Sequence, residues 1–366
     1  MIEGEKEKVV VVLGPTASGK TALAVQLAKK METDIISGDS MLVYRGFNIG
    51  TDKPDEKERG GVRHELIDIL EPQETFSVMD FQRLAAEKIT TINARGRIPV
   101  LVGGTGLYIK ALLEGYEFSR SPGDMTYRQY LEDLAAVRGR AYIHRMLAEV
   151  DPATAHRLHV NDFRRVVRAL EVWKAEQKTI SHRRFSAGGN LRYKAWVIGL
   201  RWERTLLYER INDRVRGMVA SGLEEEVREL LTAGVSRMAP AMKGIGYKEM
   251  AACLAGEISR EEAVRDIQKR PAILPNDSLL GIERCRIYTG TRPITSLCPC
   301  FWRKFFMMWQ DFSQERRKCN ISIHLKARRD SYGGQEYQFA GQFFKSGSKR
   351  ECSSHDPFGK WFSIER

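Results

Sequence analysis

The chain has 366 residues, 42% of them hydrophobic, which is enough for two domains with packed cores. It has no run of about 18 apolar residues and no apolar N-terminal signal, which argues against membrane-spanning and secreted proteins, so we expect a cytoplasmic protein with no membrane partner. The net charge of +12 suggests nucleic acid, but 16 basic and 9 acidic residues follow residue 270, so most of the excess lies in the tail.

The cysteines are concentrated in the same tail, where five of the six follow residue 270. Only Cys298 and Cys300 lie close together, and no second pair follows at the spacing of metal ligands. We therefore expect no zinc site and, in a cytosolic chain, no disulfide.

Strand and helix patterns alternate over residues 9–118. The continuous β-branched run Val9–Leu13 predicts a strand buried on both faces. Further strands are predicted at Ile35–Ile36, at Leu66–Ile69, and at Pro99–Val102 before a Gly-Gly-Thr-Gly turn. Such alternation predicts a parallel α/β sheet with ligands at the carboxyl ends of the strands.

The helices of this region follow from apolar spacing and capping. The first is expected to bury Ala22, Val25, Leu27 and Ala28. Ser77 and Asp80 form a capping box that predicts a helix over Phe81–Ala94.

Residues 119–186 lack strand patterns and predict a small helical insertion. In the predicted helix Asp162–Trp173, Arg164, Arg165 and Arg168 lie off a stripe of apolar side chains, which is formed by Phe163, Val166, Val167, Leu170 and Trp173.

The sheet pattern resumes after the insertion, with a strand at 195–200. A helix over Arg204–Ala220 is expected to bury Leu207, Ile211, Val215 and Met218, and another helix starts by Glu224. The core thus comprises residues 1–118 and 187–270, and the last predicted helix is Arg260–Arg270. From Pro271 the helical period is lost, so we expect no packed domain in 271–366.

A phosphate-binding loop is the most specific motif in the chain. The run from Gly14 to Thr21 matches G-x-x-x-x-G-K-[ST] and lies between a predicted strand and a predicted helix, which makes a chance match a poor explanation. The loop glycines let backbone N–H groups turn onto phosphates, Lys20 reaches the terminal phosphates, and Thr21 offers its hydroxyl to Mg²⁺. The expected phosphate-binding residues are Gly14, Pro15, Thr16, Ala17, Ser18, Gly19, Lys20 and Thr21.

Two polar residues follow predicted strands and are further site candidates. Asp39 can hold Mg²⁺ or accept a proton from a nucleophile, although Asp at such a place is also a common turn or N-cap residue. Thr105 can reach a ligand with its hydroxyl, although a Gly-rich turn alone would explain it. ATP hydrolases usually have a second motif, an apolar strand that ends in Asp. In this chain Leu66–Asp68 matches that motif poorly.

An ordered set of motifs resembles the tRNA dimethylallyltransferases over about residues 8–270. It comprises GPTASGKT, IISGDSMLVYRGFNIGTDKP, HELIDI, FSVMDFQ, LVGGTGLY, DPATAHRLHVNDFRRVVRALEVW, MVASGLEEEV and GIGYKEM. The resemblance implies that the loop holds dimethylallyl diphosphate. It also implies prenylation of the exocyclic amine of the adenosine 3′ of the anticodon, in tRNAs that read codons beginning with U.

The resemblance also implies roles for individual residues. Asp39 matches the catalytic Asp and is the expected general base. Thr16 and Thr105 match positions that touch the donor or the target nucleotide, and Arg210 or Arg214 is expected to contact diphosphate or that nucleotide. The pair of arginines could equally be a solvated helix face.

The implied tRNA contacts fall in two places. The first is the stretch after the second predicted strand, formed by Asp39, Ser40, Met41 and Leu42, to which Thr105 is added. The second is the helical insertion, which resembles an anticodon-stem domain, where the candidates are Arg128, Arg164, Arg165 and Arg168. Solvated helix faces remain the alternative for these arginines. A monomer is expected.

Two other functions share some of these features. An ATP-dependent small-molecule kinase would have the same loop and parallel sheet, with tight ATP binding and an arginine-rich lid. A non-catalytic RNA-binding protein would leave the loop and Asp39 unexplained.

The tail departs from the family after residue 270. A permissible coding of Pro271 through most of Arg284, translated one nucleotide earlier, gives TRHFAKRQFTWYRT, which resembles the family at this place. A similar shift near residue 340 gives a segment that resembles the start of an Sm-like RNA chaperone. We interpret the tail as an out-of-frame translation that runs into a neighbouring gene and impairs the enzyme.

Overall fold

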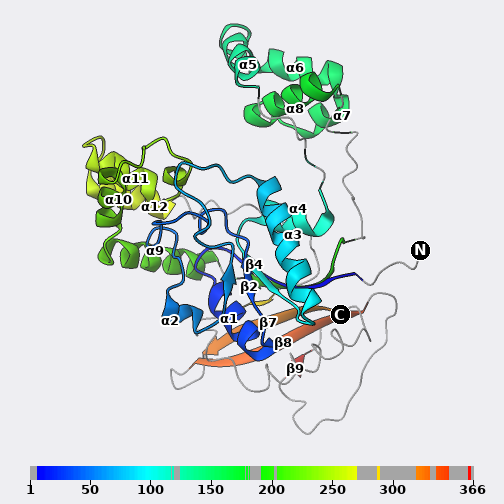
Figure 1. Cartoon of the computed structure of the whole chain (residues 1–366), viewed down its shortest axis with the longest axis vertical. Coiled ribbons are helices and arrows are strands. Elements are labelled where there is room, and N and C mark those ends of the chain that lie inside the picture. The colour runs from blue at the N-terminus through cyan, green and yellow to red at the C-terminus, as the bar shows by residue number, and fades with distance from the viewer. Residues whose placement is uncertain are drawn as a thin grey trace. The chain divides into compact units, whose positions relative to one another are not determined.

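A computed structural model describes residues 6–116, 118, 124–177, 179, 181, 191–201 and 204–269, together with the backbone of four strands after residue 270 (Figure 1). The chain divides into two compact units. The first comprises Met1–Leu113 and Arg192–Arg366, and the second comprises Glu114–Leu191. No helix in the described part of the chain is long and apolar enough to cross a membrane.

The first unit is built on a parallel sheet of five strands in the order β3-β2-β4-β1-β5. The strands are β1 (Lys8–Leu13), β2 (Ile35–Ser37), β3 (His64–Glu65), β4 (Val100–Gly103) and β5 (Lys194–Arg201). Val10 of β1 pairs with Val100 of β4 on one side and Trp196 of β5 on the other, so β1 is an interior strand. The predicted α/β class with a parallel sheet is therefore confirmed.

The sheet order continues into the tail with β6 (Ile287–Tyr288), β7 (Cys319–Arg329), β8 (Gln335–Lys345) and β9 (Phe362–Ser363). The strands β7 and β8 pair antiparallel. The expectation that 271–366 lacks a packed domain depends on side chains outside the described residues, so it stays a prediction.

Helices surround the sheet and form the rest of the first unit. They are α1 (Lys20–Met31), α2 (Glu56–Arg59), α3 (Val78–Ala94), α4 (Gly106–Glu114), α9 (Arg204–Ala220), α10 (Leu223–Thr232), the 3₁₀ helix η2 (Ala241–Lys243), α11 (Tyr247–Leu254) and α12 (Arg260–Lys269). The predicted bounds of the helix over Arg204–Ala220 match α9.

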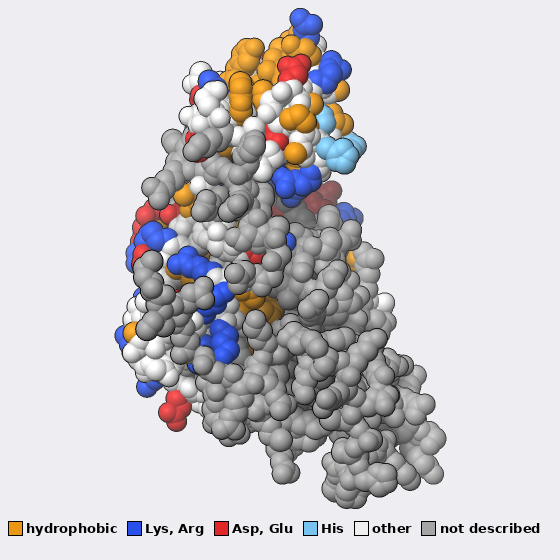
Figure 2. All heavy atoms as spheres, turned by 90° about the vertical axis from the view of Figure 1, so that its right-hand side faces the viewer, with side chains coloured by type: hydrophobic (Ala, Val, Ile, Leu, Met, Phe, Trp, Pro, Cys, Tyr) orange, Lys and Arg blue, Asp and Glu red, His pale blue; other side chains and the backbone are white. Residues whose placement is uncertain are grey.

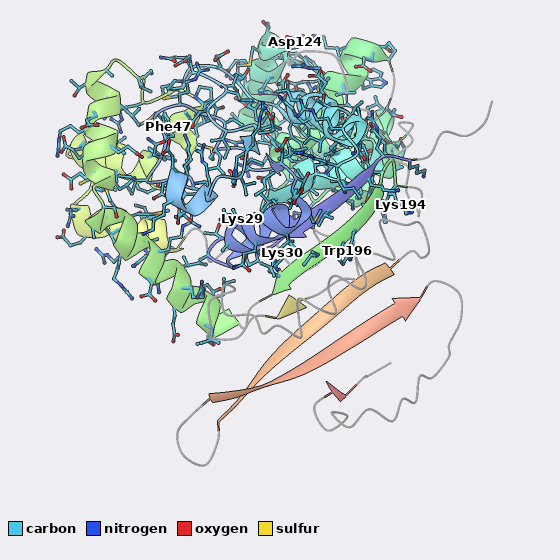
Figure 3. All side chains as sticks on the ribbon, turned by 60° about the horizontal axis from the view of Figure 1, so that its bottom comes forward. Lys29, Lys30, Phe47, Asp124, Lys194 and Trp196 are labelled. Carbon is cyan, nitrogen blue, oxygen red and sulfur yellow. The ribbon has the colours of Figure 1, made fainter. Side chains whose placement is uncertain are left out.

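Helix α1 covers one face of the sheet. Its buried side chains are Leu23, Ala24, Val25, Leu27 and Ala28, whereas Ala22, which we expected to be buried, is exposed. They pack against alternate residues of β1, β4 and β5, among them Trp196, which is 1% exposed. Figure 3 shows Trp196 on β5, with Lys29 and Lys30 in the last turn of α1, where cations interact favourably with the helix dipole.

The predicted capping box at the start of α3 is confirmed. Ser77 Oγ accepts a hydrogen bond from Asp80 N at 3.2 Å, and the Asp80 carboxylate accepts one from Ser77 N at 3.0 Å. Helix α3 then buries one residue per turn, at Phe81, Ala85, Ile89 and Ile92.

The strand predicted at Leu66–Ile69 is wrong, because β3 ends at Glu65. Leu66 and Asp68 have left-handed backbone conformations, with φ of 64° and 54°. The segment turns towards the preceding loop, where Asp68 N donates to Leu42 O at 3.1 Å and Lys53 binds the Asp68 carboxylate. Tertiary bonds thus override a short apolar pattern that by itself resembles a strand.

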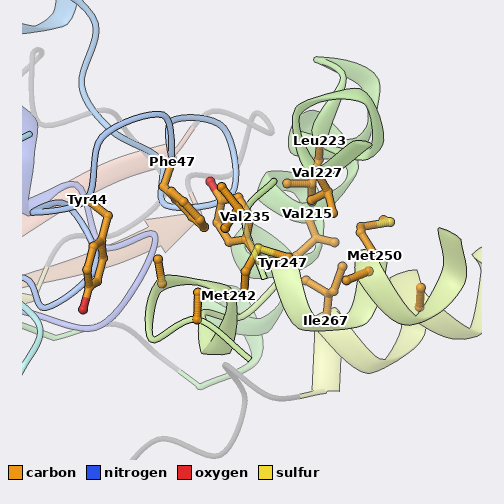
Figure 4. Close-up of a cluster of buried hydrophobic side chains, with 14 of the residues drawn as sticks. Tyr44, Phe47, Val215, Leu223, Val227, Val235, Met242, Tyr247, Met250 and Ile267 are labelled. Carbon is orange, nitrogen blue, oxygen red and sulfur yellow. The ribbon is translucent and has the colours of Figure 1, made fainter. Parts of the chain in front are cut away.

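A second hydrophobic core joins the loop after β2 to helices α9–α12 (Figure 4). Tyr44 and Phe47 enter it from the loop, and the Phe47 and Tyr247 rings lie 4.5 Å apart between centroids. Helix α9 contributes Val215, while Met218 is only partly buried. This core ties the segment after Asp39 to the C-terminal helices of the described chain.

The second unit is helical, with α5 (Met125–Arg138), α6 (Arg140–Val150), α7 (Pro152–Arg157) and α8 (Phe163–Glu176). Its core includes Val166, Val167 and Leu170 of α8, as the stripe predicts, whereas Phe163 and Trp173 are half-buried. The unit extends five residues beyond each end of the predicted insertion 119–186.

Candidate active site

The phosphate-binding loop connects β1 to α1 at the carboxyl edge of the sheet. Ala17 and Gly19 have positive φ angles of 61° and 82°, which turn the backbone before α1 begins. Ser18 N donates to Pro15 O at 3.3 Å inside the loop. A Cβ atom on Gly14 would lie 2.5 Å from Ser18 Oγ, so only glycine fits where the loop leaves the strand.

The turn after β4 lies beside this loop. A Cβ atom on Gly104 would lie 3.5 Å from Gly14 O and 3.8 Å from Lys20 Nζ. The residue after β2 lies even closer to the end of β4, because a Cβ atom on Gly103 would lie 2.5 Å from Gly38 O. The carboxyl ends of β1, β2 and β4 therefore converge, as expected for a ligand site in a parallel sheet.

Lys20 lies at the centre of this convergence. Its ammonium donates to Pro15 O at 3.3 Å. Burial lowers the pKa of Lys20, the charge of Asp39 raises it, and the charge of Arg214 lowers it further. A half-buried cation with a carboxylate and a second cation within electrostatic range is an environment that favours a polyanionic ligand.

Asp39 follows β2 and is half-buried. Its Oδ1 accepts a hydrogen bond from Met41 N at 2.8 Å, so the turn function that the sequence left open is present. Its negative charge also raises the pKa of Lys20 and of Arg214, so it lies within electrostatic range of both cations. Asp39 can therefore stabilise the turn and also act in the site.

The two candidate arginines of α9 have different partners. Arg210 Nε donates to Ala17 O at 2.9 Å and so supports the backbone of the phosphate-binding loop. Arg214 is 20% exposed, forms an ion pair with Asp52 at 3.2 Å, and donates to Thr51 O at 3.4 Å. Burial lowers the pKa of Arg214, while Asp52 and Asp39 raise it. Arg214 is thus the arginine that shares an electrostatic environment with Lys20 and Asp39.

Asp52 was missed from the sequence. It lies in the quoted stretch IISGDSMLVYRGFNIGTDKP, but nothing in its spacing marks it as a partner of an arginine 162 positions later. Its φ of 55° is left-handed, and its carboxylate pairs with the half-buried guanidinium of Arg214.

The remaining candidates near the sheet edge are half-buried, namely Thr16, Thr21, Ser40, Met41, Leu42 and Thr105. Thr105 O accepts from Tyr108 N at 3.0 Å at the start of α4, which is the turn arrangement expected of its position. Met41 Cε lies 2.6 Å from the place of a Cβ on Gly244, so this side chain reaches the second core.

Comparison with known proteins identifies the family. A model described as IPP transferase matches residues 42–272. The chain belongs to the IPP transferase family. Proteins named tRNA dimethylallyltransferase from Geobacillus kaustophilus and Geobacillus thermodenitrificans are 48% and 49% identical over 263 residues, which cover 72% of this chain and 83% of each relative. The resemblance inferred from the motifs is therefore confirmed.

Solved structures agree with this assignment. The crystal structure of a full-length tRNA isopentenylpyrophosphate transferase from Bacillus halodurans has a TM-score of 0.60 and 38% identity, and it covers 85% of this chain and 98% of that one. A eukaryotic dimethylallyltransferase crystallised while acting on tRNA has a TM-score of 0.70 at 23% identity, which shows a shared fold. Membership in the IPP transferase family favours the prenyltransferase interpretation over the kinase and the non-catalytic RNA-binding protein.

In this IPP transferase, two of the four candidate arginines of the helical unit bind one buried carboxylate. Arg128 donates to both oxygens of Glu171, at 3.0 and 2.9 Å, and Arg168 donates to Oε2 at 3.3 Å. The Glu171 side chain is 1% exposed. Arg128 and Arg168 therefore have a structural partner, which the solvated-face alternative did not foresee.

The other two arginines are exposed on the same helix. Arg165 is 74% exposed and only 3.8 Å from Asp162, and Arg164 is exposed as well. Figure 2 shows Lys and Arg side chains beside hydrophobic and His side chains on the viewer's face of this unit. Arg164 and Arg165 are the candidates whose charges are best available to a polyanionic partner.

The residues at the carboxyl ends of the strands fit the Mg²⁺ that the phosphate-binding loop predicts. Mg²⁺ takes hard oxygen ligands, usually one or two from protein side chains and the rest from phosphate and water. Thr21 supplies a hydroxyl oxygen and Asp39 a carboxylate beside the phosphate-binding loop. Among the described residues there is no cluster of three or more His, Cys, Asp or Glu that could hold a metal by itself. A metal here would depend on the ligand's phosphates.

Proposed function

We propose that this protein transfers a dimethylallyl group from dimethylallyl diphosphate to the exocyclic amine of the adenosine 3′ of the anticodon, in tRNAs that read codons beginning with U. Diphosphate leaves. The observation that carries the proposal is the electrostatic grouping of Lys20, Asp39 and Arg214 beside the phosphate-binding loop. This grouping supplies cations for a diphosphate and a carboxylate for a proton.

The diphosphate is held by the loop and the two cations. Backbone N–H groups of the loop, the N-terminus of α1 and Lys20 bind its oxygens. Arg214 adds a second charge, and Arg210 holds the loop through Ala17 O. These charges matter most as the bond from the allyl carbon to oxygen breaks, because the leaving group then gains negative charge.

Asp39 acts at the nucleophile. The lone pair of an adenine amine is delocalised into the ring, so the amine attacks well only when a base takes its proton. As the amine nitrogen bonds to the allyl carbon, the electron pair of the broken carbon–oxygen bond leaves with diphosphate, and the Asp39 carboxylate accepts the amine proton. Mg²⁺, held by Thr21 and diphosphate oxygens, would supply further charge neutralisation.

The tRNA is a partner of both units. The target base lies in a loop and can be turned out of its stack towards Asp39, Ser40, Met41, Leu42 and Thr105. Arginines of α8 meet phosphates of the anticodon stem. We propose that the protein acts in the cytoplasm, where tRNA is found. We also propose that it acts as a monomer.

A direct test uses dimethylallyl diphosphate labelled in the prenyl group and ATP labelled at the terminal phosphate. Prenyl label is expected to enter unmodified tRNA, and phosphate label is not expected to enter any acceptor. Transfer of phosphate without transfer of prenyl would support the kinase instead.

Replacing Arg164 and Arg165 together by Ala is expected to weaken tRNA binding and leave donor binding unchanged. Each phosphate contact contributes about one unit to the salt dependence of binding, so the slope of log K against log salt should become shallower by about one to two. The measurement is tRNA affinity between low and moderate salt. Arg83→Ala, an exposed arginine of α3, is the matched control. An unchanged slope would show that Arg164 and Arg165 do not contact tRNA phosphates and are solvated charges on the helix face.

Restoring the reading frame after residue 270 is expected to raise both solubility and tRNA prenylation. The reason is that the family-like stretch is a basic amphipathic segment, whereas the tail contains the apolar run CPCFWRKFFMMW, which would promote aggregation if it were exposed. Limited proteolysis of the present chain should trim it to near residue 270. A protease-resistant tail on a chain as active as its frame-restored version would contradict the out-of-frame interpretation.

A further inference from the structure

A carboxylate on α10 binds the loop that precedes Asp52. Glu226 accepts hydrogen bonds from three successive backbone amides, with distances of 3.1 Å to Asn48 N, 2.9 Å to Ile49 N and 3.4 Å to Gly50 N. It also accepts the Tyr247 hydroxyl at 2.5 Å. Four donors thus converge on one side chain that comes from about 176 residues further along the chain.

Tyr247 completes this arrangement from α11. Its side chain is fully buried, and its hydroxyl accepts a hydrogen bond from Gly50 N at 3.1 Å while it donates to Glu226. Burial and the Glu226 charge raise the pKa of Tyr247, so the phenol keeps the proton that it donates. A Cβ atom on Gly50 would lie 2.5 Å from Tyr247 Cε2, so the ring and the loop backbone are in close contact.

The held loop continues directly into the two groups that bind Arg214. Thr51 supplies the carbonyl and Asp52 the carboxylate. The turn is closed by Asp52 N, which donates to Ile49 O at 3.1 Å, and by Thr51 Oγ1, which donates to Phe47 O at 2.7 Å. Any shift of the amides at Ile49 and Gly50 therefore moves the partners of Arg214.

We infer that Glu226 and Tyr247 are positioning residues that set the place of Arg214 in the active site through the 48–52 loop. This inference rests on the proposed function, because it assigns Arg214 to the diphosphate of the donor. In this arrangement Glu226 and Tyr247 act through the loop and are not assigned a contact with the ligand. The carboxylate fixes three amides, the loop presents Asp52, and Asp52 orients the guanidinium of Arg214.

The test measures the affinity of inorganic diphosphate and of dimethylallyl diphosphate for the full chain by calorimetry. Glu226→Gln removes the charge and one acceptor, so we expect about a tenfold weaker affinity for both ligands, in line with the loss of charge-assisted hydrogen bonds. Tyr247→Phe keeps the ring in the core and should weaken affinity in the same direction. Glu225→Gln, an exposed neighbour on α10, is the matched control and should change nothing.

A positioning role is separated from a general loss of structure by combining Glu226→Gln with Asp52→Ala. Once Asp52 no longer links the loop to Arg214, Glu226→Gln should weaken diphosphate binding less than twofold further. An equal loss in both backgrounds, or unchanged affinity in Glu226→Gln and Tyr247→Phe, would overturn the inference alone. A wild-type chain that binds neither ligand would overturn the proposed function, and this inference with it.

Discussion

Asp39→Asn is expected to lower the turnover of prenyl transfer by about 10²–10⁴-fold, because a positioned general base contributes that much to proton transfer. The amide retains the acceptor that Met41 N uses at 2.8 Å, so the turn after β2 should persist. Donor affinity should change much less than turnover, since a neutral residue beside Lys20 and Arg214 does not remove a cation from the diphosphate. The measurements are single-turnover rates with saturating tRNA and calorimetry with the donor.

The background for this experiment should be the frame-restored protein, so that effects of the tail do not mask the result. Glu32→Gln, at the other end of α1, is a matched loss of one carboxylate away from the sheet edge. Near-normal turnover in Asp39→Asn would remove Asp39 from the role of base and leave it as the turn residue that its hydrogen bond to Met41 also supports.

Lys20→Ala is expected to weaken dimethylallyl diphosphate binding by about 10- to 100-fold, since a hydrogen bond to a charged group contributes about 1.5–3 kcal/mol. Lys20 begins α1 directly after the loop and lies beside the turn after β4, where a Cβ atom on Gly104 would be 3.8 Å from its Nζ. Burial lowers the pKa of Lys20, so Lys20 loses its charge at a lower pH than an ordinary lysine does. The affinity for dimethylallyl diphosphate should therefore begin to fall at that lower pH.

Lys30→Ala is the control for this change, because Lys30 lies in the last turn of the same helix (Figure 3). Calorimetry with the donor and with ATP decides between the functions. ATP that binds the wild-type protein much more tightly than dimethylallyl diphosphate would favour the kinase.

Much of the fold follows from local patterns in the sequence. The apolar run Val9–Leu13, the capping box at Ser77 and the apolar spacing in Arg204–Ala220 each depend on neighbours within a few positions, and the structure contains the strand and both helices. The phosphate-binding loop was found for the same reason, since its residues are contiguous.

What the sequence left open depends on partners that are distant along the chain. The Leu66–Ile69 pattern is apolar, but its backbone is turned by contacts with Leu42 and Lys53. Arg128 and Arg168 are expected from the sequence to be tRNA contacts or solvated charges, whereas the structure shows that a buried Glu171 binds both.

The choice between the two arginines of α9 has the same explanation. Spacing puts Arg210 and Arg214 on one face of the helix, yet only the fold reveals that one supports Ala17 O and the other pairs with Asp52. Periodicity specifies which face of a helix is polar, but the identity of the group opposite it is set by tertiary structure.

We propose that the site formed by Lys20, Asp39 and Arg214 prenylates one adenosine in a defined set of tRNAs. The most direct measurement is mass spectrometry of nuclease fragments after the frame-restored protein has reacted with dimethylallyl diphosphate and two unmodified tRNAs, one reading a codon that begins with U and one reading a codon that begins with C. We expect a single dimethylallyl group on the adenosine 3′ of the anticodon in the first tRNA and none in the second. Prenylation at another nucleotide, equal modification of both tRNAs, or no prenylation of either would contradict it.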